Sequence, residues 1–290
     1  MKKMNESMKK CGEKLVFIEG KTKWDIFSGY TCIGGRMENQ DSLAYIELDS
    51  RQVFVVCDGM GGHAGGCVAS EIAVTTVLES LQNQSPGIPT PEVMSKAVID
   101  ANNAVYIKSK DEPSLRGMGT TLTMLVFDRD AAYVTHIGDS RIYQLRNKRR
   151  KYRTTDHSMV FEQVALGRLT EEEARVHPRA NILSRAMGVL PDVEFSITKL
   201  SYYEGDRFVL CSDGVWNSQP EGELIEMLTD DEDLDAMVHT MHSVVETLGK
   251  EKGDNHDNHT MVVVDVLRDS EYQESIFSKI KKLFNPKNQS

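Results

Sequence analysis

Several aspartates stand at the ends of apolar stretches, beside residues that favour turns. The apolar stretch at 53–57 ends on Asp58, and the stretch at 208–211 is followed by Ser212-Asp213-Gly214. Glycine next to such an acid lets the backbone turn sharply and approach a small ligand closely. The acids at or beside a strand end are Asp41, Asp58, Asp139, Asp213 and Asp257.

A single aspartate of this kind is an ordinary turn residue, because Asp favours turns. Several strand-end carboxylates gathered at one place would repel one another unless cations balanced their charge. Carboxylate oxygens are hard ligands, and a set of them favours Mg²⁺ or Mn²⁺ over zinc. The pattern therefore predicts a divalent-cation site, provided that the fold brings these acids together.

The composition is that of an ordinary globular chain. The sequence has 290 residues, of which 40% are hydrophobic and 27% charged, so it can form a sizeable core. The formal net charge of -10 argues against a general nucleic-acid binder, because such a protein carries a basic field. No stretch approaches the roughly 20 apolar residues that span a bilayer, and the first residues lack the apolar segment of a signal peptide. We therefore expect a cytoplasmic enzyme.

The apolar periodicity predicts the elements that position the acids. Strands are expected at 14–19, 26–33, 42–48, 53–57, 119–127, 131–137, 141–146, 193–200, 207–211 and 260–267, and helices at 66–83, 91–109, 220–228 and 232–249. Short turns join the strands between 119 and 146, which favours antiparallel neighbours. Residues 158–190 are polar, carry two short helical patterns and are interpreted as a surface flap. The pattern indicates one α+β domain at 14–268, with sheets covered by helices.

Both ends of the chain are expected to lie outside this domain. Residues 1–13 are polar, and we expect them to be loose. Residues 269–290 form a basic tail, in which Ile276, Ile280 and Leu283 recur at helical spacing among lysines. A short basic amphipathic helix of this kind could touch an anionic membrane or a partner, or pack on its own domain.

Seven short motifs follow one another along the domain. They are Arg36-Met-Glu-Asn-Gln-Asp41, Asp58-Gly-Met-Gly-Gly-His63, Gly119-Thr120-Thr121, Gly138-Asp139-Ser140-Arg141, Asp156-His157-Ser158, Ser212-Asp213-Gly214 and Asp257-Asn258-His259-Thr260. In type and order they resemble the motifs of the metal-dependent serine/threonine protein phosphatases of the PPM, or type 2C, family. Each motif is short enough to arise by chance, but together they span about residues 34–266. The chain is therefore identified as a member of this family, of the bacterial type.

The resemblance implies a central antiparallel β-sandwich flanked by helices, in αββα layers, with two metal ions at one edge. It implies that Asp58 bridges two Mn²⁺ or Mg²⁺ ions and that the carbonyl of Gly59 binds one of them. Asp213 and Asp257 would hold one side of the site, and Asp41 would act there mostly through water.

The resemblance further implies a third, weaker metal at Asp139 together with Asp213, and substrate phosphate binding by Arg36. Two divalent ions can share a water and lower its pKa toward neutrality, ready for in-line attack on phosphorus. Arginine suits the phosphate because its planar fork can meet two oxygens at once. The expected catalytic residues are therefore Arg36, Asp58 and Asp213, and the flap at 158–190 is expected to border the cleft.

The motifs depart from many family members at two positions. Met60 stands where eukaryotic relatives have a histidine proposed as the general acid, and Gln40 stands where other members have a glutamate. Both changes resemble bacterial-type members, and they leave His63 or a water on the metal as alternatives for the acid. His256 and His259 flank Asp257 and raise zinc as an alternative metal, but we interpret both imidazoles as surface neighbours of that aspartate.

The favoured hypothesis is hydrolysis of phosphoserine and phosphothreonine in proteins by a water that a dinuclear metal site activates. Such an enzyme would oppose serine/threonine kinases in bacterial signalling, as a cytoplasmic monomer with no nucleic-acid partner. One alternative is a catalytically weak relative that acts as a phosphoprotein-binding scaffold, against which the complete set of acids argues. Another is a phosphatase dedicated to a single regulatory protein.

Overall fold

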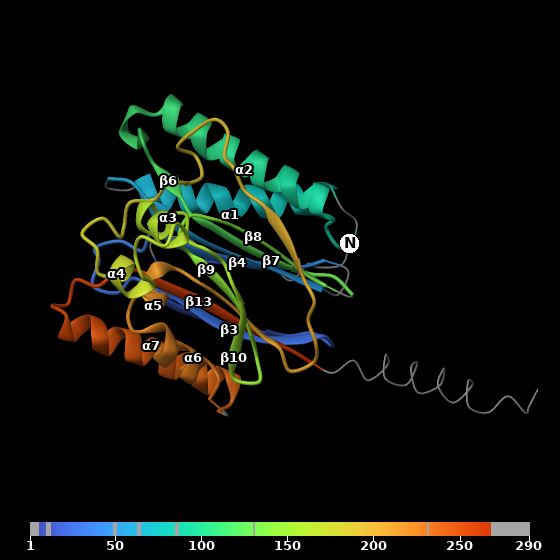
Figure 1. Cartoon of the computed structure of the whole chain (residues 1–290). Helices are drawn as coiled ribbons and strands as arrows, with labels where there is room; N and C mark the ends of the chain where they lie inside the picture. Colours follow the sequence, from blue (N-terminus) through green and yellow to red (C-terminus); the bar gives the residue numbers. More distant parts are fainter. Residues whose placement is uncertain are drawn as a thin grey trace, which may run out of the picture.

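The structure is a computed structural model that describes residues 6–9, 13–48, 51–62, 65–84, 87–129, 131–230 and 232–267. Two β-sheets lie face to face, and helices cover the outer side of each sheet (Figure 1). All strand pairs in the described ranges are antiparallel. The expected α+β fold, a sandwich in αββα layers, is confirmed.

The two sheets are built from strands that lie far apart in the sequence. The first has the order β1-β4-β5-β7-β8-β11, with β6 paired to β5, and consists of β1 (Glu6–Lys9), β4 (Asp41–Leu48), β5 (Arg51–Met60), β6 (Gly119–Thr120), β7 (Leu122–Phe127), β8 (Ala132–Ile137) and β11 (Ile197–Leu200). The second has the order β10-β9-β12-β13-β3-β2 and consists of β2 (Leu15–Lys21), β3 (Asp25–Cys32), β9 (Arg141–Arg146), β10 (Arg149–Arg153), β12 (Arg207–Cys211) and β13 (His259–Val266).

The helices form the two outer layers. α1 (Gly65–Gln84) and α2 (Pro91–Asp111) cover the first sheet, and α6 (Glu221–Leu228) and α7 (Leu234–Glu251) cover the second (Figure 1). The start of α2 follows from its sequence, because the Thr90 hydroxyl accepts a hydrogen bond from the backbone N–H of Val93 and Pro91 occupies the first turn.

Burial on both faces explains the continuous apolar stretch in β5. Val53, Val55 and Cys57 pack into the core under the first helical layer, while Phe54 and Val56 pack into the core between the sheets. Alternate side chains of a strand point to opposite faces, so a strand covered on both sides must be apolar at every position. β12 divides its side chains in the same way between the inter-sheet core and the layer of α6 and α7. These two buried strands are the ones that deliver the acids of the strand-acid-glycine pattern.

The flap predicted at 158–190 is present at one end of the sandwich (Figure 1). It carries the short helices α3 (Met159–Ala165) and α4 (Glu171–Arg175), and α4 starts with a capping box between Thr170 and Glu173. The flap returns to the body through paired backbone hydrogen bonds between Thr120 and Met187, with N···O distances of 3.1 and 2.9 Å. The flap is therefore fastened to the end of the sheet that carries Asp58.

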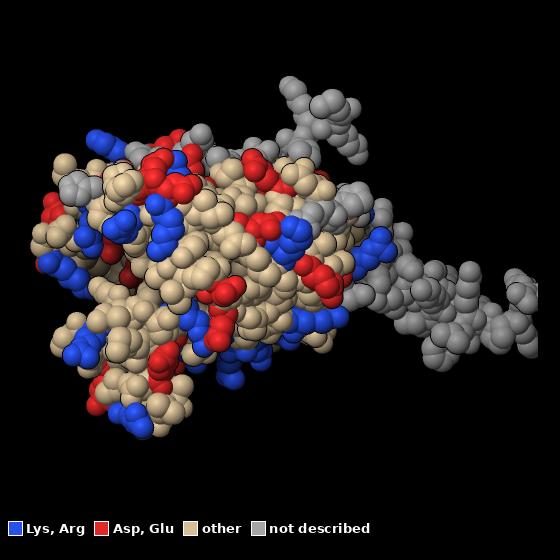
Figure 2. Space-filling view, turned by 90° about the horizontal axis from the view of Figure 1, so that it is seen from above, with Lys and Arg blue, Asp and Glu red and all other residues tan. Residues whose placement is uncertain are grey.

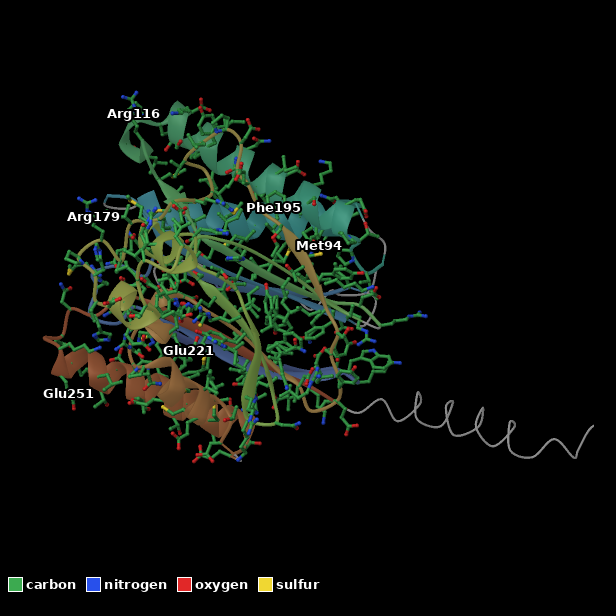
Figure 3. The ribbon with its side chains drawn as sticks, in the orientation of Figure 1. Met94, Arg116, Arg179, Phe195, Glu221 and Glu251 are labelled. Atoms are coloured by element: carbon green, nitrogen blue, oxygen red, sulfur yellow. The ribbon has the colours of Figure 1, made fainter. Side chains whose placement is uncertain are left out.

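Some elements differ from the expectation for physical reasons. The 193–200 segment is a strand only at Ile197–Leu200, where it pairs with β8. Val193 and Phe195 precede this pairing and pack against the α1–α2 layer, where Figure 3 shows Phe195 near Met94 of α2. β10 was not predicted because its side chains are polar and half or fully exposed, which leaves no apolar alternation to detect. Residues 6–9, expected to be loose, pair with β4.

The predicted tail at 269–290 lies outside the described residues. Within the residues that are described, no helix has the length and apolar character needed to cross a bilayer.

Candidate active site

Four of the five predicted acids line a cleft at the end of the sandwich where the flap is attached. The cleft has a volume of about 590 Å³, and its lining includes Arg36, Asp58, Gly59, Asp139, Asp213 and Asp257. In Figure 2, acidic atoms are visible inside a hollow at the same end of the molecule. Segments far apart in the sequence thus place the predicted side chains around one space.

Asp41 and Asp58 occupy opposite positions on neighbouring strands, β4 and β5. The backbone of Asp58 is held firmly, because its N–H donates to Thr121 Oγ1 and its carbonyl accepts from the N–H of Thr121, both at 2.8 Å. Asp41 is buried below the cleft, and its Oδ2 accepts a hydrogen bond from Ser212 Oγ at 2.8 Å. β5 therefore presents Asp58 to the cleft, and Asp41 supports it from beneath.

Gly59 is required by close backbone packing. Its N–H donates to the carbonyl of Gln40 at 3.1 Å, and a Cβ at this position would lie 2.0 Å from the carbonyl oxygen of Gly66. A side chain there would force the start of α1 away from the sheet. Glycine at this position therefore keeps the turn after Asp58 tight against the cleft.

Asp213 and Asp139 lie on the opposite wall. Asp213 lies two residues after the end of β12 and begins the short helix α5 (Asp213–Trp216), which was not predicted. The indole Nε1 of Trp216 donates to the backbone carbonyl of Asp139 at 2.9 Å and so joins the two acidic turns. Asp139 is almost fully buried, and its side chain is at the cleft wall.

Asp257 and Arg36 form the exposed rim. Arg36 Nη2 lies 3.0 Å from Asp257 Oδ2, and both side chains are nearly half exposed. Asn258, for which no separate role was predicted, fastens the Arg36 loop. Its Oδ1 accepts from the N–H of Gln40 at 2.9 Å, and its Nδ2 donates to the carbonyls of Ile33 and Glu38 at 2.7 and 3.0 Å. In the sequence, the asparagine directly after Asp257 could have indicated this role, because a buried amide can form hydrogen bonds with several loops.

Burial and mutual proximity change the acidity of this group. Burial raises the pKa of Asp41 and of Asp213 to about 7, and the charge of Asp257 adds to both shifts. Burial also raises the pKa values of Asp58 and Asp139 well above the usual range, with the neighbouring aspartates as the next cause. Nearby positive charge would stabilise the charged form of carboxylates in this arrangement.

The donor set fits divalent cations of the Mg²⁺ and Mn²⁺ type. All the acids offer hard oxygen atoms. Two carboxylate oxygens, Asp41 Oδ1 and Asp213 Oδ1, are buried and have no hydrogen-bond partner among the described residues. Since buried polar atoms are normally paired, these two oxygens indicate that the site is built to hold something positively charged.

The remaining sequence interpretations have mixed outcomes. Met60 lines the cleft, whereas His63 lies outside the described residues. Asn181 and Leu183 of the flap also line the cleft, so the flap borders it as expected. The interpretation of His259 as a surface neighbour is wrong, because its side chain is fully buried.

The Asp156-His157 motif is structural. Asp156 forms two hydrogen bonds with Arg141, from Nε to Oδ1 at 2.8 Å and from Nη2 to Oδ2 at 2.7 Å, and both side chains are buried. The backbone of His157 pairs with Gly138 and with Ser184 of the flap, both at 2.9 Å. The motif therefore braces the flap against the turn that carries Asp139.

Comparisons with known proteins agree with this geometry. The family model of protein phosphatase 2C matches residues 28–258. The serine/threonine phosphatase stp of Listeria monocytogenes is 36% identical over 197 residues, which cover 67% of this chain and 78% of that protein. The crystal structure of the Mycobacterium tuberculosis serine/threonine phosphatase PstP/Ppp superposes with a TM-score of 0.73 at 33% identity, over 84% of this chain and 100% of that one.

A second structure is similar to the same extent. It is the catalytic domain of PstP in complex with two manganese ions, with a TM-score of 0.71 at 32% identity, over 84% of this chain and 99% of that one. The family match covers most of the chain and includes six of the seven motifs and the first two residues of the seventh. The chain belongs to the protein phosphatase 2C, or PPM, family.

Proposed function

We propose that the acids of the cleft hold the divalent cations of a phosphoserine- and phosphothreonine-hydrolysing site and that Arg36 binds the substrate phosphate. As a PPM member the chain is a metal-dependent protein serine/threonine phosphatase. The observation that carries the residue assignment is the convergence of the acids in one cleft, with two of their oxygens buried and unpaired. The proposed metal-binding residues are Asp41, Asp58, Gly59, Asp139, Asp213 and Asp257.

The proposed roles follow from where each residue lies. Asp58, which β5 presents to the cleft, would contact two ions, and the carbonyl of Gly59 would contact one of them. Asp213 and Asp257 would complete one side, with Asp41 acting from below through water. The two manganese ions of PstP support Mn²⁺ or Mg²⁺ as the cofactor. When bound, such ions supply a water of lowered pKa and neutralise the charge of the phosphoryl group.

A third and weaker cation is proposed between Asp139 and Asp213. The support is that, after burial, the charge of Asp213 is the largest cause that raises the pKa of Asp139. Close acids on two adjoining turns, joined by the Trp216 indole, could share one further ion.

Arg36 is placed to bind the phosphate of an incoming side chain. Its guanidinium lies at the rim of the cleft, nearly half exposed, and is held on one side by Asp257. A guanidinium with free donors can bind two phosphoryl oxygens through its planar fork. The contacts of Asn258 keep the Arg36 loop in place. The Arg36 guanidinium is therefore already positioned when the phosphate binds, and little ordering of the loop is needed.

The cellular setting is likewise a proposal. The substrates are phosphoproteins, and we propose that the enzyme opposes a serine/threonine kinase in bacterial signalling, which the bacterial origin of the similar proteins supports. A cytoplasmic location is proposed because such kinases use ATP. A monomer is proposed because the acids, Gly59 and Arg36, to which roles are assigned above, all belong to one chain. We keep 14–268 as the phosphatase domain, with membrane or partner contact by 269–290 as a proposal for the tail.

The experiment is phosphate release from a phosphothreonine peptide with Mn²⁺, with Mg²⁺ and with EDTA. We expect metal-dependent release by the wild type and by Asp111→Asn, a matched control at the exposed end of α2. Asp58→Asn should lose nearly all turnover and keep its far-UV circular dichroism. Full activity in folded Asp58→Asn would contradict the residue assignment. Absence of release by folded, metal-loaded wild type would instead favour the scaffold alternative, which the family and the complete acid set do not favour.

A further inference from the structure

Behind the edge that carries Asp257, four potential metal ligands converge between the second sheet and α7. Cys32 ends β3, His259 begins β13, and His242 and Glu246 lie on one face of α7 at i and i+4. One ligand atom from each of these four side chains lies within 4.8 Å of the others. The acids of the active-site cleft do not belong to this group.

The four side chains are already directed toward one another. Glu246 Oε1 lies 3.0 Å from His259 Nε2 and accepts a weak hydrogen bond from Cys32 Sγ at 3.6 Å. Cys32 and His259 are buried in the core side of the helix layer. His242 Nε2 is also buried, and it has no hydrogen-bond partner among the described residues. A buried and unpaired imidazole nitrogen beside three other donors indicates a missing shared partner.

We propose that Cys32, His242, Glu246 and His259 form a closed, structural zinc site. One thiolate, two imidazoles and one carboxylate are a four-coordinate zinc set, whereas the oxygen-only cleft suits harder ions. Zinc bonds of 2.0–2.3 Å in a tetrahedron place ligand atoms about 3.4 Å apart. Because the four atoms already lie within 4.8 Å, small side-chain movements complete the tetrahedron.

Surrounding contacts orient the ligands. The N–H of Gly34 donates to Cys32 Sγ at 3.5 Å, a contact that stabilises a thiolate. Tyr30 Oη lies 3.3 Å from His259 Nδ1, which fixes the ring so that Nε2 faces the group. His256 Nε2 lies 3.0 Å from Glu246 Oε1. Outer contacts of this kind are a regular feature of metal sites.

The protonation states are compatible with metal binding. Burial lowers the pKa of His242, so this imidazole is neutral and can donate a lone pair. Burial raises the pKa of the Cys32 thiol to about 11, so zinc binding must release the thiol proton.

The site would connect α7 to both rim segments of the active-site cleft. Cys32 precedes the loop that carries Arg36, and His259 stands two residues after Asp257. Zinc would therefore anchor the backbone on either side of the Arg36–Asp257 ion pair to one helix. The site would be structural, because all four coordination positions come from the protein.

The test is a Co²⁺ titration of the full, metal-stripped chain, followed by visible and near-ultraviolet absorption. The active-site ligands are oxygens, so a thiolate-to-cobalt charge-transfer band reports on the proposed site alone. We expect this band to saturate at one equivalent in the wild type and in Asp58→Asn, and one equivalent of Zn²⁺ to abolish it. Cys32→Ser should lose the band. Loss of an outer contact already weakens metal sites 10–100-fold, so His242→Gln should weaken cobalt binding by more than about 100-fold.

Two matched controls should keep the band. His239→Gln changes an exposed histidine on the same helix, and Cys211→Ser changes a buried free cysteine outside the group. If Cys32→Ser fails to fold, the His242→Gln variant tests the site instead, because position 242 is only partly buried. The proposal would be overturned if folded wild type shows no thiolate band or if the band survives in Cys32→Ser. It would also be overturned by undiminished cobalt binding in His242→Gln or by loss of the band in Asp58→Asn.

Discussion

Asp41 and Asp58 face each other directly across the antiparallel pair of β4 and β5, so two carboxylates share one face of the sheet. Like charges at directly opposed positions destabilise a strand pair. Burial removes the water that would screen them, and it raises the pKa of Asp41 to about 7 and that of Asp58 well above its usual range. The first sheet therefore carries an electrostatic cost in the metal-free protein.

Metal-free stability should depend on this cost in a defined direction. The pKa of Asp41 is about 7 in the folded chain and about 4 when unfolded. Between these values the folded state binds more protons, so this residue makes the fold less stable as the pH rises from 4 to 7. In EDTA, Asp41→Asn should therefore raise Tm relative to the wild type by more at pH 8 than at pH 5. An extra 1 kcal/mol corresponds to about 2–4 °C.

The comparison must be made as a difference between variant and wild type. Buried imidazoles such as His157, whose pKa burial lowers to about 3, change stability in the opposite direction with pH, and they cancel in the difference. Asp111→Asn is the matched control, with no pH-dependent difference expected. A Tm difference for Asp41→Asn that is the same at both pH values would contradict the proposed repulsion.

Arg36→Ala should lower kcat/KM for a phosphothreonine peptide by about 10²–10³-fold, because it removes a donor that meets the charge developing on the phosphoryl oxygens. Arg36→Lys should recover only part of the loss, since lysine keeps the charge but not the fork. Stability should change by less than about 1 kcal/mol, because the ion pair with Asp257 is exposed. Steady-state kinetics with thermal denaturation checks both points, and unchanged kcat/KM in Arg36→Ala would remove Arg36 from the site.

Asn258→Ala should weaken both the fold and catalysis. The variant leaves the carbonyls of Ile33 and Glu38 without their donor, and we expect a loss of about 1–3 kcal/mol in the free energy of unfolding. It should also reduce kcat/KM, because the Arg36 loop loses its support. In an Arg36→Ala background the catalytic part should largely disappear, as a double-mutant cycle would measure. Equal catalytic losses in both backgrounds would show that Asn258 does not act through Arg36.

Breaking the buried pair of Arg141 and Asp156 should be costly. Arg141→Met leaves the Asp156 carboxylate buried without its partner, and we expect about 3–5 kcal/mol of destabilisation in urea unfolding. Arg141→Met with Asp156→Leu should cost less than the sum of the two single changes. Lys96→Met, which breaks an exposed pair with Asp100, is the control and should cost less than about 1 kcal/mol. A small effect of Arg141→Met would contradict the bracing role of this pair.

Much of the fold was predictable because its signals are local. Strands covered on both faces appear as unbroken apolar stretches, and the amphipathic helices appear at their own period. β10 escaped prediction because an exposed edge strand needs no apolar residue. The Arg141–Asp156 pair escaped because nothing in the sequence indicates that two residues 15 positions apart share a buried contact.

The sequence by itself determined the residue types, the strand-acid-glycine turns and the order of the motifs, because these depend on neighbours along the chain. From them followed the family, the expectation of hard metal ions and the choice of Arg36 for phosphate. Only the tertiary structure decided which acids face one another, that Asn258 ties the rim loops, and that His259 is buried beside Cys32 and α7. Glu246 and Cys32 are 214 positions apart, and proximity over such a distance arises from sheet pairing and helix packing. No local pattern of residues records that proximity.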